Sequence, residues 1–223
     1  MITTAPVRLS LFSNAVNPRK IVLMRRYMVP GSVLDVGCGN GLYGLEAVKL
    51  GHEVLQLDVI DRRDESVAAL PFDKRDAEDL DSLPDKAFAN VIAFDIMEHL
   101  DDDAKFLRQL RRVCSGRLIL SVPNSDDALL NQVGVTHLHR IDKTHRREYS
   151  PDELQAAVEH AGWRCLQIAP QRNHLLPYFA RTLALDGVVA RTAARLISLQ
   201  CLALIKLGVF RNECVADWFL VAE

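Results

Sequence analysis

Apolar and polar positions alternate along the chain in a pattern that predicts strands and helices in turn. The runs 33–37 and 53–58 are short and apolar, as buried strands are, and residues 42–50 between them have helical spacing and end at Gly51. Further strand-like runs occupy residues 90–95, 117–123, 163–169 and 214–221. Strands that alternate with helices favour a mostly parallel sheet covered by helices on both faces.

Three other segments have the periodicity or the end signals of helices. Residues 18–28 are amphipathic, and the acidic run 101–103 precedes a segment with apolar positions on one face. Residues 150–153 (SPDE) form a capping box with proline at the first helical position, and Gly162 ends the helix that follows.

We therefore predict an α/β fold, a doubly wound, Rossmann-like and mostly parallel sheet of about seven strands whose last strand is antiparallel. Residues 1–223 are expected to form a single domain. Within it we expect an N-terminal helical segment at 1–30 and a helical insertion or lid at 171–212, before the last strand.

Composition narrows the classes of protein that remain. A net charge of −2 gives no general attraction for polyanions and disfavours nucleic acid as a partner. The five cysteines are scattered without a C-x-x-C pair, which fits free thiols in a reducing compartment. The N-terminus lacks the apolar core of a signal peptide, and the apolar stretch 196–205 is too short to span a bilayer. We expect a cytoplasmic protein with no membrane span.

The turn after the first strand carries the main chemical signal. The run 33–41 (VLDVGCGNG) places three alternating glycines where a strand enters a helix, so that a ligand can lie against the backbone and the free N–H groups of the helix. Gly39, Gly41 and Gly44 also satisfy G-x-G-x-x-G, and Asp58 follows at the distance of a ribose-binding acid. A nicotinamide-dependent oxidoreductase is therefore an alternative at this point.

Two features favour S-adenosylmethionine over a dinucleotide. Asp35 stands inside the strand before the turn, where it suits a ligand with an ammonium group and no pyrophosphate. Asp76-Ala77 precedes a loop, and the strand 90–95 runs directly into the segment 96–100 (IMEHL). With these motifs the sequence resembles the class I S-adenosylmethionine-dependent methyltransferases, from about residue 33 to residue 162.

The resemblance implies a cofactor site made of nine residues. It places Asp35 near the methionine end of the cofactor, Asp58 at the ribose hydroxyls, Asp76 with Ala77 at the adenine, Asp95 facing the sulfonium, and Gly37, Cys38, Gly39 and Gly41 along the cofactor backbone.

Methyl transfer is an in-line displacement, so that much of its rate comes from alignment of acceptor and methyl group. Glu98 and His99 follow the strand that faces the methyl group, and His145 precedes the capped helix. We name these three as candidate catalytic residues, either as a base for an acceptor proton or as groups that orient the loop.

The spacing Asp95-x-x-Glu98-His99 is similar to the E-x-x-E-H motif of the ubiquinone-biosynthesis O-methyltransferases and the small-RNA 2′-O-methyltransferases, in which it holds a divalent metal. The first position here is aspartate, which has a shorter reach. We assign no metal ligands, and a divalent metal remains an alternative to metal-free transfer.

The expected function is S-adenosylmethionine-dependent methyl transfer to an oxygen or nitrogen of a small molecule. The alternatives are a methyltransferase-like protein that binds cofactor or a partner without turnover, and a metal-assisted O-methyltransferase acting on RNA or a lipophilic acceptor. The sequence does not identify the acceptor or the oligomeric state.

Overall fold

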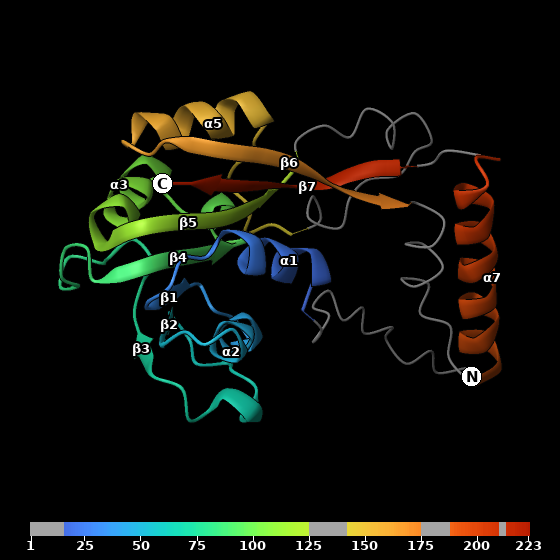
Figure 1. Cartoon of the computed structure of the whole chain (residues 1–223), viewed down its shortest axis with the longest axis horizontal. Coiled ribbons are helices and arrows are strands. Elements are labelled where there is room, and N and C mark those ends of the chain that lie inside the picture. The colour runs from blue at the N-terminus through green and yellow to red at the C-terminus, as the bar shows by residue number, and fades with distance from the viewer. Residues whose placement is uncertain (1–15, 125–141, 175–187, 210–212) are drawn as a thin grey trace, which may run out of the picture.

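A computed structural model describes residues 16–124, 142–174, 188–209 and 213–223 (Figure 1). In chain order its elements are α1 (Pro18–Tyr27), β1 (Val33–Val36), α2 (Leu42–Lys49), β2 (Val54–Asp58), η1 (Glu65–Val67), β3 (Phe72–Lys74), β4 (Phe88–Phe94), η2 (Met97–His99), α3 (Asp103–Val113), β5 (Cys114–Pro123), α5 (Pro151–His160), β6 (Cys165–His174), α7 (Val188–Lys206) and β7 (Glu213–Ala222).

The strands form one seven-stranded sheet in the order β3-β2-β1-β4-β5-β7-β6. Neighbours from β3 to β5 are parallel, and β7 is antiparallel to both β5 and β6. This confirms the predicted fold class, including the antiparallel last strand. The strand order reverses between β1 and β4, and in open α/β sheets ligands bind at such a point, beyond the carboxyl ends of the strands.

Side chains of the central strands alternate between two apolar clusters, one on each face of the sheet. Leu34, Val91 and Leu118 belong to the cluster that packs against α3 and α5. Their strand neighbours Val33 and Ile92 belong to the other cluster, which packs against α1 and α2. This alternation is the reason that the sheet is covered on both sides, because each strand is apolar on both faces.

The strands differ from the sequence-based expectation in several boundaries and in one strand, β3, that was not expected. β6 continues to His174, past residue 171 where the insertion was expected to begin. β3 has only three residues, and such a short strand at the sheet edge leaves no alternating pattern to detect. The proposed lid role of the segment before β7 stays a prediction, and residues 175–187 and 210–212 of it lie outside the described residues.

Among the described residues, no helix combines the length and the apolarity needed to cross a membrane. α7 lies beyond the ends of β6 and β7, apart from the helices that cover the sheet (Figure 1).

The cap of α5 gives a test of the fold. Ser150 Oγ accepts from the Glu153 N–H at 3.3 Å, and Glu153 Oε2 accepts from the Ser150 N–H at 2.9 Å. We expect Ser150→Ala to lower the free energy of unfolding by about 1 kcal/mol, because the Glu153 N–H loses its side-chain acceptor and the Glu153 carboxylate loses the Ser150 hydroxyl. Urea denaturation measures the change. Gln155→Ala, on the exposed face of the same helix, is the control and should stay within about 0.5 kcal/mol of the parent. An equal loss in both variants would contradict the capping role.

Candidate active site

The glycine turn lies between β1 and α2 and takes a backbone path that side chains would obstruct. Gly37, Gly39 and Gly41 have φ of 67°, 55° and 75°. A Cβ at Gly37 would lie 2.9 Å from the Ile96 side chain, and one at Gly41 would lie 2.8 Å from Val67. The turn therefore requires glycine for conformation at three positions and for space at two of them.

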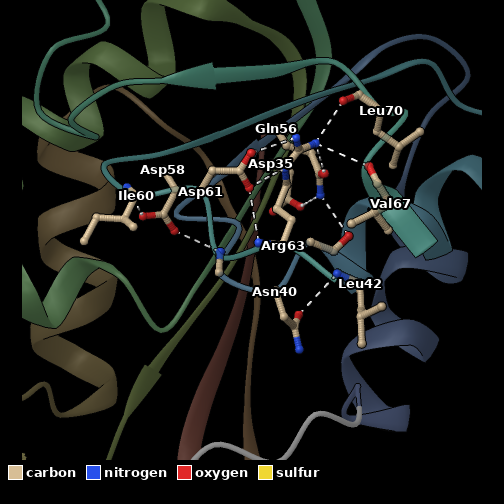
Figure 2. A network of polar contacts seen from close by, with 12 residues as sticks. Asp35, Asn40, Leu42, Gln56, Asp58, Ile60, Asp61, Arg63, Val67 and Leu70 are labelled. Carbon is tan, nitrogen blue, oxygen red and sulfur yellow. Dashed lines mark hydrogen bonds and ion pairs between the residues drawn. The ribbon is translucent and has the colours of Figure 1, made fainter. Parts of the chain in front are cut away.

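The side chain of Gln56, on β2, joins the turn to β1 (Figure 2). Its buried Nε2 donates to Asp35 Oδ2 at 3.0 Å and to the Gly41 carbonyl at 2.8 Å. Its Oε1 accepts from the Arg63 guanidinium at 3.4 Å. Gly44 has to be glycine for the same reason, since a Cβ there would lie 2.3 Å from the Gln56 amide nitrogen.

Asp35 lies beneath the turn and is 3% exposed. Burial raises the pKa of its carboxyl to about 7, although the hydrogen bonds from the Gln56 amide and the Gly44 backbone oppose the rise. The carboxylate thus faces Gln56 and the start of α2, and its contacts are those of a group that braces the turn. Its expected position near the methionine end of a cofactor remains a prediction.

Asp58 ends β2 at the edge of the sheet where ligands enter. Its Oδ2 accepts from the Gly39 N–H at 2.9 Å, and its Oδ1 accepts from the Ile60 N–H at 3.3 Å. These two bonds fix the carboxylate plane, and each oxygen has a further lone pair for a ligand hydroxyl.

A cavity of about 230 Å³ opens at this edge of the sheet. It brings together five of the residues singled out from the sequence, which are Gly37, Asp58, Asp76, Ala77 and His99. The lining also includes residues that sequence reasoning missed, namely Val59, Arg75, Glu78, Ile96, Leu100, Asp101 and Arg146. Asp76 is exposed and its Oδ1 accepts from the Glu78 N–H at 2.9 Å, while Ala77 is buried.

The remaining candidate cofactor residues lie outside the cavity lining. Cys38 is buried, and burial raises the pKa of its thiol, so that it has the character of a packing residue. Gly39 and Gly41 belong to the turn behind Gly37, and Asp35 lies beneath it.

Asp95 follows β4 in a left-handed conformation with φ of 55°. Its carboxylate accepts from the Ser121 hydroxyl at 2.6 Å and forms an ion pair with Lys20 of α1 at 2.5 Å. The Lys20 ammonium is buried, 4.9 Å from the centroid of the Phe94 ring. Sequence analysis missed Lys20, because a lysine on an amphipathic helix ordinarily points to solvent.

The charges around Lys20 extend to β7. Although burial lowers the pKa of Lys20, the nearby Asp95, Tyr43 and Asp217 raise it to a net value above the ordinary one. Burial, followed by the charge of Asp95, raises the pKa of Asp217 to about 7. The ligand edge therefore holds a buried cation between two carboxyl groups.

The three candidate catalytic residues lie together. Glu98, His99 and His145 place one ligand-capable atom each within 4.8 Å of one another, and the two imidazole rings meet edge to face with centroids 4.5 Å apart. Glu98 is fully buried, and neither of its carboxyl oxygens has a hydrogen-bond partner among the described residues. Burial, and then the charge of Asp95, raise the pKa of Glu98 well above its usual value. Burial also lowers the pKa of His145.

A short chain of hydrogen bonds sets the tautomer of His99. The Thr144 hydroxyl donates to Asp142 Oδ1 at 2.6 Å, and hydrogen bonds from Thr144 lower the pKa of the Asp142 carboxyl. A hydroxyl has one proton, so that Thr144 Oγ1 can meet His99 Nδ1, 2.9 Å away, only as an acceptor. His99 therefore carries a proton on Nδ1, and in the neutral imidazole the lone pair is on Nε2. Thr144 and Asp142 gave no signal in the sequence.

The same group is the one described cluster with the donor set of a metal centre. Two imidazoles and a carboxylate suit a divalent transition metal, and the buried, unpartnered oxygens of Glu98 fit a ligand role. Asp95, the first residue of the motif, is not part of the cluster, because its carboxylate bonds to Lys20 and Ser121. The residues fit a three-ligand site that includes His145 and leaves out Asp95, the first residue of the motif.

Comparisons with known proteins agree with this geometry. A family model described as a methyltransferase domain matches residues 17–168. A ubiquinone biosynthesis O-methyltransferase of Xanthomonas euvesicatoria is 28% identical over 167 residues, which are 67% of this chain and 70% of that relative.

Solved structures share the fold at lower identity. An S-adenosylmethionine-dependent methyltransferase from Archaeoglobus fulgidus superposes with a TM-score of 0.64, at 24% identity and over 92% of both chains. A Burkholderia thailandensis 1,6-didemethyltoxoflavin-N1-methyltransferase, solved with S-adenosylhomocysteine, has a TM-score of 0.58 at 18% identity, over 92% of this chain and 76% of that one. The family match and these relatives support S-adenosylmethionine over the nicotinamide alternative. The chain belongs to the methyltransferase-domain family, and it is an S-adenosylmethionine-dependent methyltransferase.

Proposed function

We propose that the chain transfers the methyl group of S-adenosylmethionine to a hydroxyl oxygen of a small-molecule acceptor, with His99 as the general base. The observation that carries the proposal is the tautomer of His99, whose ring lines the cavity while Asp142 and Thr144 hold its Nδ1 proton. Oxygen is favoured over nitrogen as the acceptor atom because the Xanthomonas relative is named an O-methyltransferase.

We assign the cofactor to the cavity beside the glycine turn. Asp58 would accept the ribose hydroxyls, since its plane is fixed by two backbone N–H groups. Asp76 and Ala77 would meet the adenine, and Gly37 leaves room for the chain of the cofactor. Asp95, with Lys20 behind it, would lie nearest to the reacting methyl group, at the end of β4.

The sulfonium of S-adenosylmethionine supplies a methyl group that is already activated for displacement. His99 Nε2 would take the hydroxyl proton as the acceptor oxygen bonds to that carbon, and the carbon–sulfur bond pair returns to sulfur. Thr144 would hold the imidazole in place, and Asp142 would stabilise the charge that develops on it. Glu98, whose raised pKa favours the protonated form, is a poor base and is assigned an orienting role.

The first test is titration calorimetry with S-adenosylhomocysteine and with NADH. We expect the parent to bind the former and not the latter. Asp58→Asn should weaken binding about 10- to 100-fold, because it removes charge-assisted hydrogen bonds worth roughly 1.5–3 kcal/mol. Asp79→Asn, an exposed carboxylate outside the cavity lining, is the control and should bind as the parent does. Parent-like binding by Asp58→Asn would contradict the assigned ribose contact.

The Gln56 bridge gives a second prediction. Gln56→Leu removes the donor to Asp35 and to the Gly41 carbonyl, which leaves buried acceptors unsatisfied at a cost of about 1–3 kcal/mol. We expect lower stability and an S-adenosylhomocysteine affinity reduced about fivefold or more, because the turn loses its brace. Gln109→Leu is the matched control, because Gln109 is also a buried amide that donates to a carboxylate, that of Asp81. Gln109 is on α3, which packs against the other face of the sheet from α2. This variant should lose stability and keep its affinity; a parallel loss of affinity in both variants would refute a specific bracing role.

The base assignment is tested with an acceptor found by screening phenolic and sugar hydroxyls for release of S-adenosylhomocysteine. Thr144→Val should lower kcat about 10- to 100-fold with little change in cofactor affinity, and Thr144→Ser should restore it. His99→Gln should lower kcat by about 100-fold, because the variant has no imidazole to accept the hydroxyl proton. A folded parent that binds S-adenosylhomocysteine and turns over no acceptor in the panel would favour the non-catalytic alternative.

A metal-assisted transfer is the second candidate, favoured by the Glu98, His99 and His145 cluster. A metal there would act as a Lewis acid on the acceptor oxygen, with these three residues as its ligands. In the same assay, excess EDTA separates the two mechanisms. Full activity in EDTA supports His99 as a base, whereas loss that Mn²⁺ restores supports the metal-assisted candidate.

A further inference from the structure

Lys20 is a buried cation at a position that disfavours one. It lies in the first turn of α1, at the positive end of the helix dipole, and that turn contains no acidic residue. Lys20, Leu23 and Met24 have the spacing of one helix face, and all three are buried. An apolar side chain at position 20 would continue this face without the cost of burying a charge. The reason for a lysine therefore lies in the groups that its ammonium contacts.

These groups are found at the end of β4. The Lys20 Nζ lies 2.5 Å from Asp95 Oδ2, 4.9 Å from the centroid of the Phe94 ring and 5.6 Å from the centroid of the Tyr43 ring. The two rings meet edge to face, with centroids 4.8 Å apart. The attraction of the ammonium for their π electrons adds to the ion pair. Lys20 thus ties α1 to the point where β4 ends at Phe94 and Asp95 follows.

The carboxylate of Asp95 is held by two partners and still reaches the surface. Its Oδ1 accepts from the Ser121 hydroxyl at 2.6 Å, while its Oδ2 pairs with Lys20. The Asp95 side chain is nevertheless 48% exposed, whereas that of Lys20 is 4% exposed. A molecule at this edge would therefore meet a carboxylate whose charge is balanced by an ammonium behind it.

Asp217 of β7 also acts on Lys20 through its charge. Burial, followed by the charge of Asp95, raises the pKa of Asp217 to about 7, and the charge of Lys20 opposes the rise. Asp217 is therefore only partly ionised near neutral pH. Asp95 is the main counter-charge of Lys20, and the pair as a whole is close to neutral.

The two forms of the cofactor differ in charge at the sulfur. S-adenosylmethionine carries a sulfonium, and S-adenosylhomocysteine carries a neutral thioether. The proposed function puts this sulfur next to Asp95, and the inference rests on that placement. An unpaired carboxylate there would attract the sulfonium and have little effect on the thioether. A carboxylate that is paired with a buried ammonium attracts the sulfonium much less.

We propose that Lys20 is a positioning residue that holds Asp95 and balances its charge, and so sets the affinity for S-adenosylmethionine relative to that for S-adenosylhomocysteine. Lys20 acts through Asp95 and does not itself touch the reacting atoms. Stability alone does not explain the pair, because well-packed apolar side chains often stabilise a core as much as a buried ion pair does.

The test is titration calorimetry of the full chain with each form of the cofactor, without an acceptor, so that no methyl group is transferred. The measured quantity is the ratio of the two dissociation constants. Lys20→Met should shift this ratio about fivefold in favour of S-adenosylmethionine, because the charge of Asp95 is left unpaired. Asp95→Asn keeps the size of the side chain and tolerates the left-handed backbone. It should shift the ratio about fivefold in the opposite direction, because Lys20 is then unpaired.

The double variant, Lys20→Met with Asp95→Asn, has neither charge and should return to the ratio of the parent. Arg25→Gln is the matched control, since it removes an exposed cation from the last turn of the same helix, and it should also keep the parent ratio. Opposite shifts in the single variants and their cancellation in the double variant support the charge role, because a loss of structure would weaken both ligands in all three variants.

An unchanged ratio in both single variants would overturn the proposal and leave the pair with a structural role only. That result differs from a failure of the cofactor assignment. In that case the parent binds neither form, or Asp58→Asn binds both forms as the parent does, and the proposed function is overturned together with this inference.

Discussion

The hydrogen bonds of the Gln56 side-chain amide are the interactions on which the shape of the glycine turn depends. A buried amide requires partners for both its donor and its acceptor, and here these partners are Asp35, the Gly41 carbonyl and Arg63. Arg63 is itself held by the Leu70 carbonyl at 2.9 Å and by Asp61 at 3.0 Å. Because every member is tied to a strand or to the turn, the glycine turn has its shape before a ligand arrives, and little ordering entropy remains to be lost on binding.

Features determined by neighbours in the chain could be predicted from the sequence. The capping box at Ser150 joins residues three positions apart, and the positive φ of the turn glycines is a local requirement of the backbone. The further lack of space at Gly37 and Gly41 comes from Ile96 and Val67, which are distant in the chain. The fold class followed from the alternation of apolar runs, because each run has to be buried on both faces. β3 escaped prediction because three residues are too few to show a period.

The site was predictable only in part, for the same physical reason. Gln56 meets Asp35 across 21 positions, Thr144 meets His99 across 45, and Lys20 meets Asp95 across 75. Each of these contacts depends on the strand order of the sheet, and none of the three partners Gln56, Thr144 and Lys20 has a residue type that marks a site by itself. The sequence motifs located the edge of the sheet at which the chemistry occurs; the groups that orient that chemistry come from elements far away in the chain.

The charge balance at this edge matters for a reaction that consumes a cation. Methyl transfer turns a sulfonium into a neutral thioether, so that an acidic edge would bind the starting cofactor more strongly than the transition state, in which the positive charge is already dispersing. Lys20 pairs with Asp95, and burial favours the protonated forms of Glu98 and Asp217. These three carboxyl groups, next to the end of β4, therefore carry little net negative charge. An arrangement of this kind limits the stabilisation of the sulfonium ground state and leaves the rate to alignment and to the removal of the acceptor proton.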